Sequence, residues 1–111
     1  MAFMRIMDAQ SIGASASAYS VKVQLRDNHV VHALQYLITG SGTVSLTLET
    51  SSDSFSWVSN GVKASGLVAT SGPGSDGKDI IPLRIKPGDF ARILVEVTSD
   101  TAITTLDFIQ K

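Results

Sequence analysis

The sequence contains no cysteine, which excludes disulfide bonds and thiolate metal ligands. A chain of 111 residues fits one domain, since two cores of half that size would each be too small to be stable. Without covalent crosslinks, this domain must be stabilised by packing or by oligomerisation.

Charge is scarce, at 17% of the residues, and the formal net charge is -1. Nucleic-acid binding normally requires a clustered basic face, so we expect no nucleic-acid partner. Long apolar runs are also missing: no segment approaches the roughly 20 apolar residues that span a bilayer. Arg5 and Asp8 interrupt the first apolar stretch, unlike the uninterrupted core of a secretory signal. We therefore expect no membrane partner and no signal peptide.

Alternation of apolar and polar residues is the dominant pattern that is present. It is clearest in the runs 21–25, 44–48 and 93–97, where every second residue is Val, Leu or Ile. A period of two is typical of half-buried strands. Less regular candidate strands lie at 30–38, 57–58 with 62–64, 67–70, 79–85 and 102–109.

Turn residues separate these runs at intervals of roughly ten residues, as in sandwiches of short antiparallel strands. Examples are Gly40-Ser41-Gly42, Asn60-Gly61 and Ser99-Asp100. We predict an all-β, antiparallel β-sandwich, jelly-roll-like, with about eight short strands over residues 19–111. Residues 1–18 are predicted as an N-terminal arm or linker, because 10–18 are mainly small; residues 3–9 also suit a short helix.

Two motifs have ordinary explanations. Residues 72–77 match G-x-G-x-x-G, but Pro73 lies inside the match and a strand-like run follows, which favours a flexible hairpin loop over a dinucleotide site. His29 and His32 would lie on opposite faces of a strand, an unsuitable arrangement for joint metal ligation.

Loop carboxylates leave a calcium site as an alternative, although Asp is also a common turn residue. No calcium-loop pattern, activated nucleophile or recognisable carboxylate pair occurs, so we expect no cofactor, no metal and no enzymatic activity. The acidic residues in or near loops are Asp53, Asp76, Asp79, Asp89 and Asp100.

The segment 52–57 carries the single tryptophan, Trp57, close to Phe55. In one interpretation Trp57 begins the next strand and caps the core. In the other, Trp57 or Phe55 anchors a sugar ring or a neighbouring subunit.

Residues 42–57, with the turn Ser52-Asp53-Ser54-Phe55-Ser56-Trp57, and residues 81–93, with Phe90-Ala91-Arg92, resemble small β-sandwich proteins of tailed-phage and prophage virions. The likeness extends over residues 20–109. The resembling turns usually carry Gly after the Asp, where this chain has Ser54. Carbohydrate-binding and discoidin-like jelly rolls share the pattern.

The resemblance implies a structural head, neck or tail accessory subunit, made in the bacterial cytoplasm, that forms a homo-oligomer and docks on other virion proteins. The arm would add to a neighbour's sheet edge or groove. The alternative is a carbohydrate-binding module, in which Trp57, Phe55 or Tyr36 stacks on sugar. The expected contact residues are Phe3, Met4, Ile6, Met7, Phe55 and Trp57.

Overall fold

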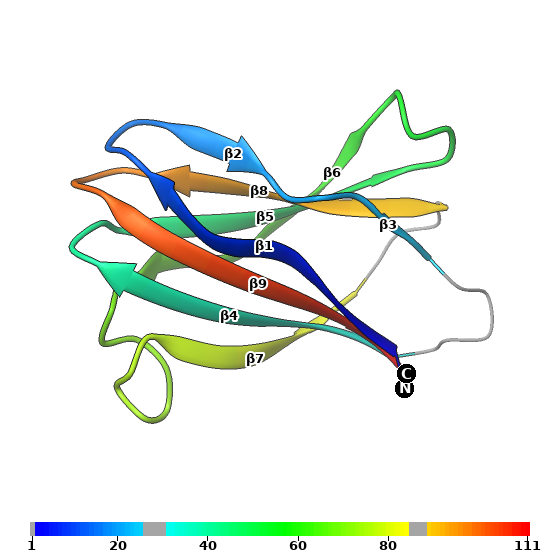
Figure 1. Ribbon diagram of the computed structural model, residues 1–111. Coiled ribbons are helices and arrows are strands. Elements are labelled where there is room, and N and C mark those ends of the chain that lie inside the picture. The colour runs from blue at the N-terminus through cyan, green and yellow to red at the C-terminus, as the bar shows by residue number, and fades with distance from the viewer. Residues whose placement is uncertain (1, 26–30, 85–88) are drawn as a thin grey trace.

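The computed structural model describes residues 2–25, 31–84 and 89–111, which form strands, turns and loops (Figure 1). None of these residues belongs to a helix that has the length and hydrophobicity to cross a membrane. The strands are β1 (Ala2–Ile12), β2 (Ser17–Tyr19), β3 (Val23–Gln24), β4 (His32–Gly40), β5 (Val44–Ser51), β6 (Val58–Leu67), β7 (Lys78–Leu83), β8 (Phe90–Val97) and β9 (Ala102–Gln110).

The strand pairing is that of one long antiparallel ribbon folded over on itself. β1 pairs with β9, β2 and β3 with β8, β4 with β7, and β5 with β6. The ribbon closes into two sheets because β9 also pairs with β4, and β8 also pairs with β5. The sheet orders β1-β9-β4-β7 and β2-β8-β5-β6 therefore make a jelly roll, which confirms the predicted fold class.

The core lies between the two sheets and follows the alternation in the sequence. In β5 and β8 every second side chain is fully buried, as predicted for 44–48 and 93–97. These inward residues are aliphatic, and their burial from both sheets supplies the main stabilising contribution. The largest fully buried side chains include Phe108, Ile6, Leu34, Ile38, Leu46, Leu48, Ile93 and Leu106.

The segment expected to be an arm or a short helix is instead an integral part of the sandwich. Ala2–Ile12 forms β1, which pairs with β9 from Ala2↔Gln110 to Ile12↔Ala102 (Figure 1). Ala9 has a positive φ of 45°, and the register shifts twice between Arg5 and Gln10. These bulges hide the strand in the sequence, because they break the period of two.

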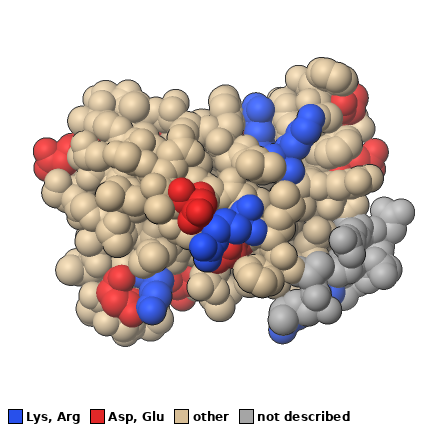
Figure 2. Space-filling view, viewed as in Figure 1, with Lys and Arg blue, Asp and Glu red and all other residues tan. Residues whose placement is uncertain are grey.

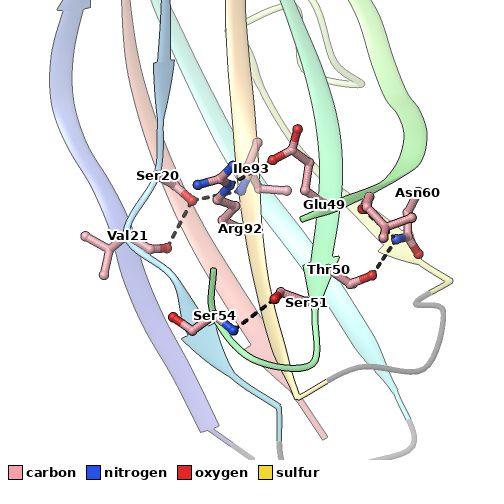
Figure 3. A network of polar contacts seen from close by, with 10 residues as sticks. Ser20, Val21, Glu49, Thr50, Ser51, Ser54, Asn60, Arg92 and Ile93 are labelled. Carbon is pink, nitrogen blue, oxygen red and sulfur yellow. Dashed lines mark hydrogen bonds and ion pairs between the residues drawn. The ribbon is translucent and has the colours of Figure 1, made fainter. Parts of the chain in front are cut away.

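The run 21–25 is interrupted where one continuous strand was predicted. Only Val23–Gln24 is strand, and Val21 is exposed rather than inward. At the interruption, the Ile93 amide donates to Oγ of Ser20 rather than to a backbone carbonyl, while the Ser20 amide donates to the Ile93 carbonyl (Figure 3). The serine hydroxyl thus replaces part of the ladder and divides β2 from β3.

Two other local predictions are wrong. Asn60-Gly61 is not a turn between strands: β6 continues through it, with Gly61 at a φ of 89° and shifted pairing to β5. Glycine accommodates this conformation at low cost, so the chain forms a bulge rather than reversing. The predicted strand 67–70 is a turn after Leu67, closed by a hydrogen bond from the Ser71 amide to the Val68 carbonyl.

Candidate functional site

The outer surface of the β1-β9-β4-β7 sheet, named here the apolar face, carries exposed hydrophobic side chains from all four strands. The strand register aligns Phe3 with Ile109, Ala33 and Pro82 in one row across the sheet. The next row contains Ile80, of which 55% is exposed, compared with 66% for Phe3. Leu37 and Ile103 on β4 and β9 are also exposed on this face.

Charges on the apolar face are few and mostly paired. Arg5 donates from Nε to Oδ1 of Asp107 at 3.0 Å and from its terminal nitrogen to Oδ2 at 3.3 Å. This hydrogen bonding and the charge of the nearly buried Asp107 raise the pKa of Arg5. Asp8 lies 3.6 Å from Arg5, and Lys78, at the opposite edge, lies 3.6 Å from Asp76. Figure 2 shows one side of the molecule as mostly uncharged, with small groups in which acidic and basic side chains adjoin.

A shallow pocket of about 310 Å³ lies beside the β7 edge of the apolar face. Gln35 and Ile80 form its floor from neighbouring strands, and Pro73 reaches it from the loop between β6 and β7. Lys78 and Asp79 contribute one charge of each sign to the lining.

The outer surface of the other sheet carries an arginine stack, formed by Tyr19, Arg92 and Trp57. The guanidinium carbon of Arg92 lies 3.8 Å from the centroid of the Tyr19 ring and 4.1 Å from that of Trp57. Nε of Arg92 donates to Oε1 of Glu49 at 2.8 Å, directly across the β5–β8 pair (Figure 3). Planar contact with two rings and a carboxylate fixes Arg92 in one position.

The loop between β5 and β6, which leads to Trp57, presents Phe55 to solvent. Oδ1 of Asp53 accepts hydrogen bonds from the amides of Ser56 and Phe55, and from the hydroxyl of Ser51. These bonds, led by the one from Ser56, lower the pKa of Asp53 to about 2. These hydrogen bonds to Asp53 fix the conformation of the loop. Phe55 nevertheless remains 87% exposed.

Ser54 adopts a φ of 69° in this loop. Positive φ is the conformation that favours glycine, which is the residue that the resembling turns carry at this position. The Ser54 amide donates to Oγ of Ser51 at 2.9 Å (Figure 3). Lys22 donates to Oγ of Ser54. These local bonds stabilise a conformation that a serine rarely adopts.

The expected contact residues fall into separate groups. Ile6 and Met7 are buried in the core of their own sandwich, so in this fold they are packing residues rather than contact residues. Phe3 is exposed on the apolar face, and Met4 is exposed on the same strand. Phe55 and Trp57 lie at the other sheet, and Trp57 packs over Arg92 outside that sheet instead of capping the core.

The other candidates are placed as follows. Tyr36 is 3% exposed between the sheets, so it cannot stack on a sugar as the alternative required. His32 packs near Phe108, and His29 lies outside the described residues. No three histidine or acidic side chains of the described segments lie close enough to hold a metal ion together. Residues 72–77 form a folded loop between two strands, with the Gly77 amide bonded to the Ser71 carbonyl.

The sequence matches no protein-family model, and no curated protein matches it. The candidate surfaces are therefore defined by geometry alone.

Several residues of these surfaces were not identified from the sequence. Tyr19 and Arg92 of the arginine stack and the Glu49 that pairs with Arg92 come from three strands, and Leu37 and Ile80 are exposed apolar residues in runs predicted only as strands. The alternation signalled that Glu49 and Arg92 face away from the core. Their pairing depends on which strands are neighbours, and this is a non-local property.

Proposed function

We propose that this protein is a non-enzymatic structural and assembly subunit, of the kind found in tailed-phage virions, which associates with itself and with other virion proteins. The observation that carries the proposal is the apolar face, where Phe3, Leu37, Ile80 and Ile103 are exposed on one sheet surface. Contiguous exposed apolar surface is uncommon on monomers and typical of interaction sites.

The sheet edges favour association through a face over association through an edge. Pro82 lies in the edge strand β7 and cannot donate a backbone hydrogen bond to an added strand. The edge strands β1 and β6 both contain register shifts where they pair with β9 and β5. Such features generally oppose edge-to-edge pairing.

The test is the solution mass by light scattering of the natural protein and of two matched variants. We expect a closed oligomer for the natural protein and monomers for Ile80→Lys, which places a positive charge on the apolar face. Val62→Lys is the control, because Val62 is similarly exposed on β6 of the opposite sheet, and it should keep the natural mass. A monomeric natural protein, up to high concentration, would refute self-assembly.

A carbohydrate-binding module is the second candidate, favoured by Tyr19 and Trp57 around Arg92 and by the exposed Phe55, two residues before Trp57. Arg92 occupies one face of the Tyr19 and Trp57 rings, so a sugar would use their remaining faces or Phe55. Screening on a glycan array tests this candidate. A hit that Phe55→Ala and Tyr19→Ala both abolish would support it, and a blank array would reject it.

A further inference from the structure

We infer that two copies of this chain pack their apolar faces together about a two-fold axis that runs parallel to the strands. This inference rests on the proposed function and specifies its partner, the surface and the symmetry. Isologous dimers are the most common closed oligomers, and their interface must be complementary to itself. The register of the four strands determines which residues lie side by side, and therefore which residues would meet across such an interface.

Three rows cross the apolar face from the β1 edge to the β7 edge. The first runs from Phe3 through Ile109 and Ala33 to Pro82. The second contains Arg5, Asp107, Gln35 and Ile80 in that order. The third ends with Lys78, after Thr105 and Leu37. At the start of the third row, the Ala9 amide bonds to Oγ of Thr105, and Asp8 is the neighbouring residue.

A two-fold axis parallel to the strands places β1 opposite the partner's β7, and β9 opposite the partner's β4. Each row then meets the reverse of itself. Phe3 lies opposite the partner's Pro82, so the most exposed apolar side chain of the first row meets another apolar one. Asp8 lies opposite the partner's Lys78, so charges of opposite sign meet at both edges of the interface.

Arg5 also finds a suitable environment in this arrangement. It lies opposite the partner's Ile80, which lines the pocket that Asp79 and Gln35 also line. The aliphatic part of an arginine packs on apolar side chains while its guanidinium stays near acceptors. Arg5 is about half exposed in the single chain and can therefore extend across the interface.

A two-fold axis perpendicular to the strands is less favourable. Centred on the second row, it superposes Arg5 on Arg5 and Asp107 on Asp107, which sets like charges against each other. Shifted by half a row, it sets Ile80 opposite Lys78 and Leu37 opposite Gln35, so that apolar groups meet polar ones. The parallel axis instead sets Phe3 against the partner's Pro82 and Asp8 against the partner's Lys78, and it places no like charges opposite each other.

Crosslinking tests this symmetry cleanly because the chain has no cysteine. Asp8→Cys protein is mixed with Lys78→Cys protein and treated with a bismaleimide of about 10 Å reach, since packed sheets lie about 10 Å apart. We expect a band of twice the chain mass in the mixture and no such band from either variant alone. Ile80→Cys alone should not crosslink, whereas the perpendicular axis centred on the second row would bring two such cysteines together.

Charge reversal supplies an independent measurement that needs no crosslinker. Asp8→Lys should weaken dimerisation about tenfold, and adding Lys78→Asp should restore most of the affinity, because the swapped pair again has opposite signs. A protein that is oligomeric by light scattering but gives no band in the mixture and no restoration would overturn this two-fold axis and leave the assembly function standing. A protein that is monomeric throughout would overturn both.

Discussion

Arg92 shows how much of one residue's role comes from its neighbours. Its position on β8, between two inward residues, follows from the alternation in the sequence. Its contacts with Tyr19, Trp57 and Glu49 follow only from the folded arrangement of β2, β5 and β8. The side chain joins three segments of the outer surface, so its replacement affects more than one strand.

Replacing Arg92 with Lys should destabilise the protein by about 1 kcal/mol, because an ammonium group cannot stack flat against two rings. The emission of Trp57, the single tryptophan, should also shift, since one face of its ring loses its cover. Urea unfolding followed by fluorescence measures both effects. Arg84→Lys, at an exposed arginine, is the matched control and should change neither quantity. Equal behaviour of the two variants would show that the stack contributes nothing.

Asp53 gives a prediction about pH. Its pKa in the folded protein is about 2, below the ordinary value of 3.8, so its charged form stabilises the fold fully above about pH 4. That contribution is lost as the pH falls from about 4 to 2 and the carboxylate becomes protonated. The stability difference between the natural protein and Asp53→Asn should therefore be largest near neutral pH and shrink towards pH 2. Unfolding curves at several pH values measure it, and a difference that is constant with pH would contradict the role of Asp53.

At the scale of the elements, the sequence predicted strands well where the period of two is unbroken. Residues 44–48 and 93–97 are regular and central, and both predictions are confirmed. The predictions failed where a side chain or a glycine changes the backbone pattern, as Ser20 does between β2 and β3 and Gly61 does within β6. Bulges likewise concealed β1, because Ile6 and Met7 are consecutive and both buried.

The close contact between the β6–β7 loop and β4 should be disrupted by one additional methyl group, and the stability of the fold should fall. Gly77 has a φ of 79°, and a Cβ atom there would lie 2.3 Å from the Ile38 carbonyl oxygen. Gly77→Ala should therefore cost about 2 kcal/mol or more in stability. Gly13→Ala is the control, because a Cβ at Gly13 would meet nothing within 4 Å, and it should change stability little. Chemical denaturation measures the free energy of unfolding of both variants. A similarly small loss in both would show that the loop shifts away from Ile38 at little cost.

At the scale of the whole molecule, the class of fold was predictable because it depends on periodicity and turn spacing, which are local properties. The two candidate surfaces were not, because each combines residues from strands that are distant in sequence. Phe3, Leu37 and Ile103, for example, share one face only through the pairing of β1 and β4 with β9. An exposed apolar residue has the same local pattern as a buried one, so the sequence alone did not separate them.

A dimer that forms through the apolar face links folding to protein concentration. The midpoint of thermal unfolding should rise as the concentration is raised, because association stabilises only the folded chain. The Ile80→Lys variant should show a midpoint that does not depend on concentration, because its new charge lies opposite the partner's Arg5. Scanning calorimetry over a hundredfold range of concentration makes the comparison. A midpoint of the natural protein that stays constant would show that folded chains do not associate in that range.

The pairing of Ala2 with Gln110 determines how the molecule resists a mechanical pull. In an antiparallel pair the hydrogen bonds lie perpendicular to the strands, so tension applied between residues 2 and 110 loads them one after another and peels β1 away from β9. Tension between Ile12 and Gln110, at opposite ends of the same pair, would load them all at once in shear. The sandwich therefore resists less force along the line between residues 2 and 110 than along the line between residues 12 and 110, and tension along the first line separates β1 from β9 one hydrogen bond at a time.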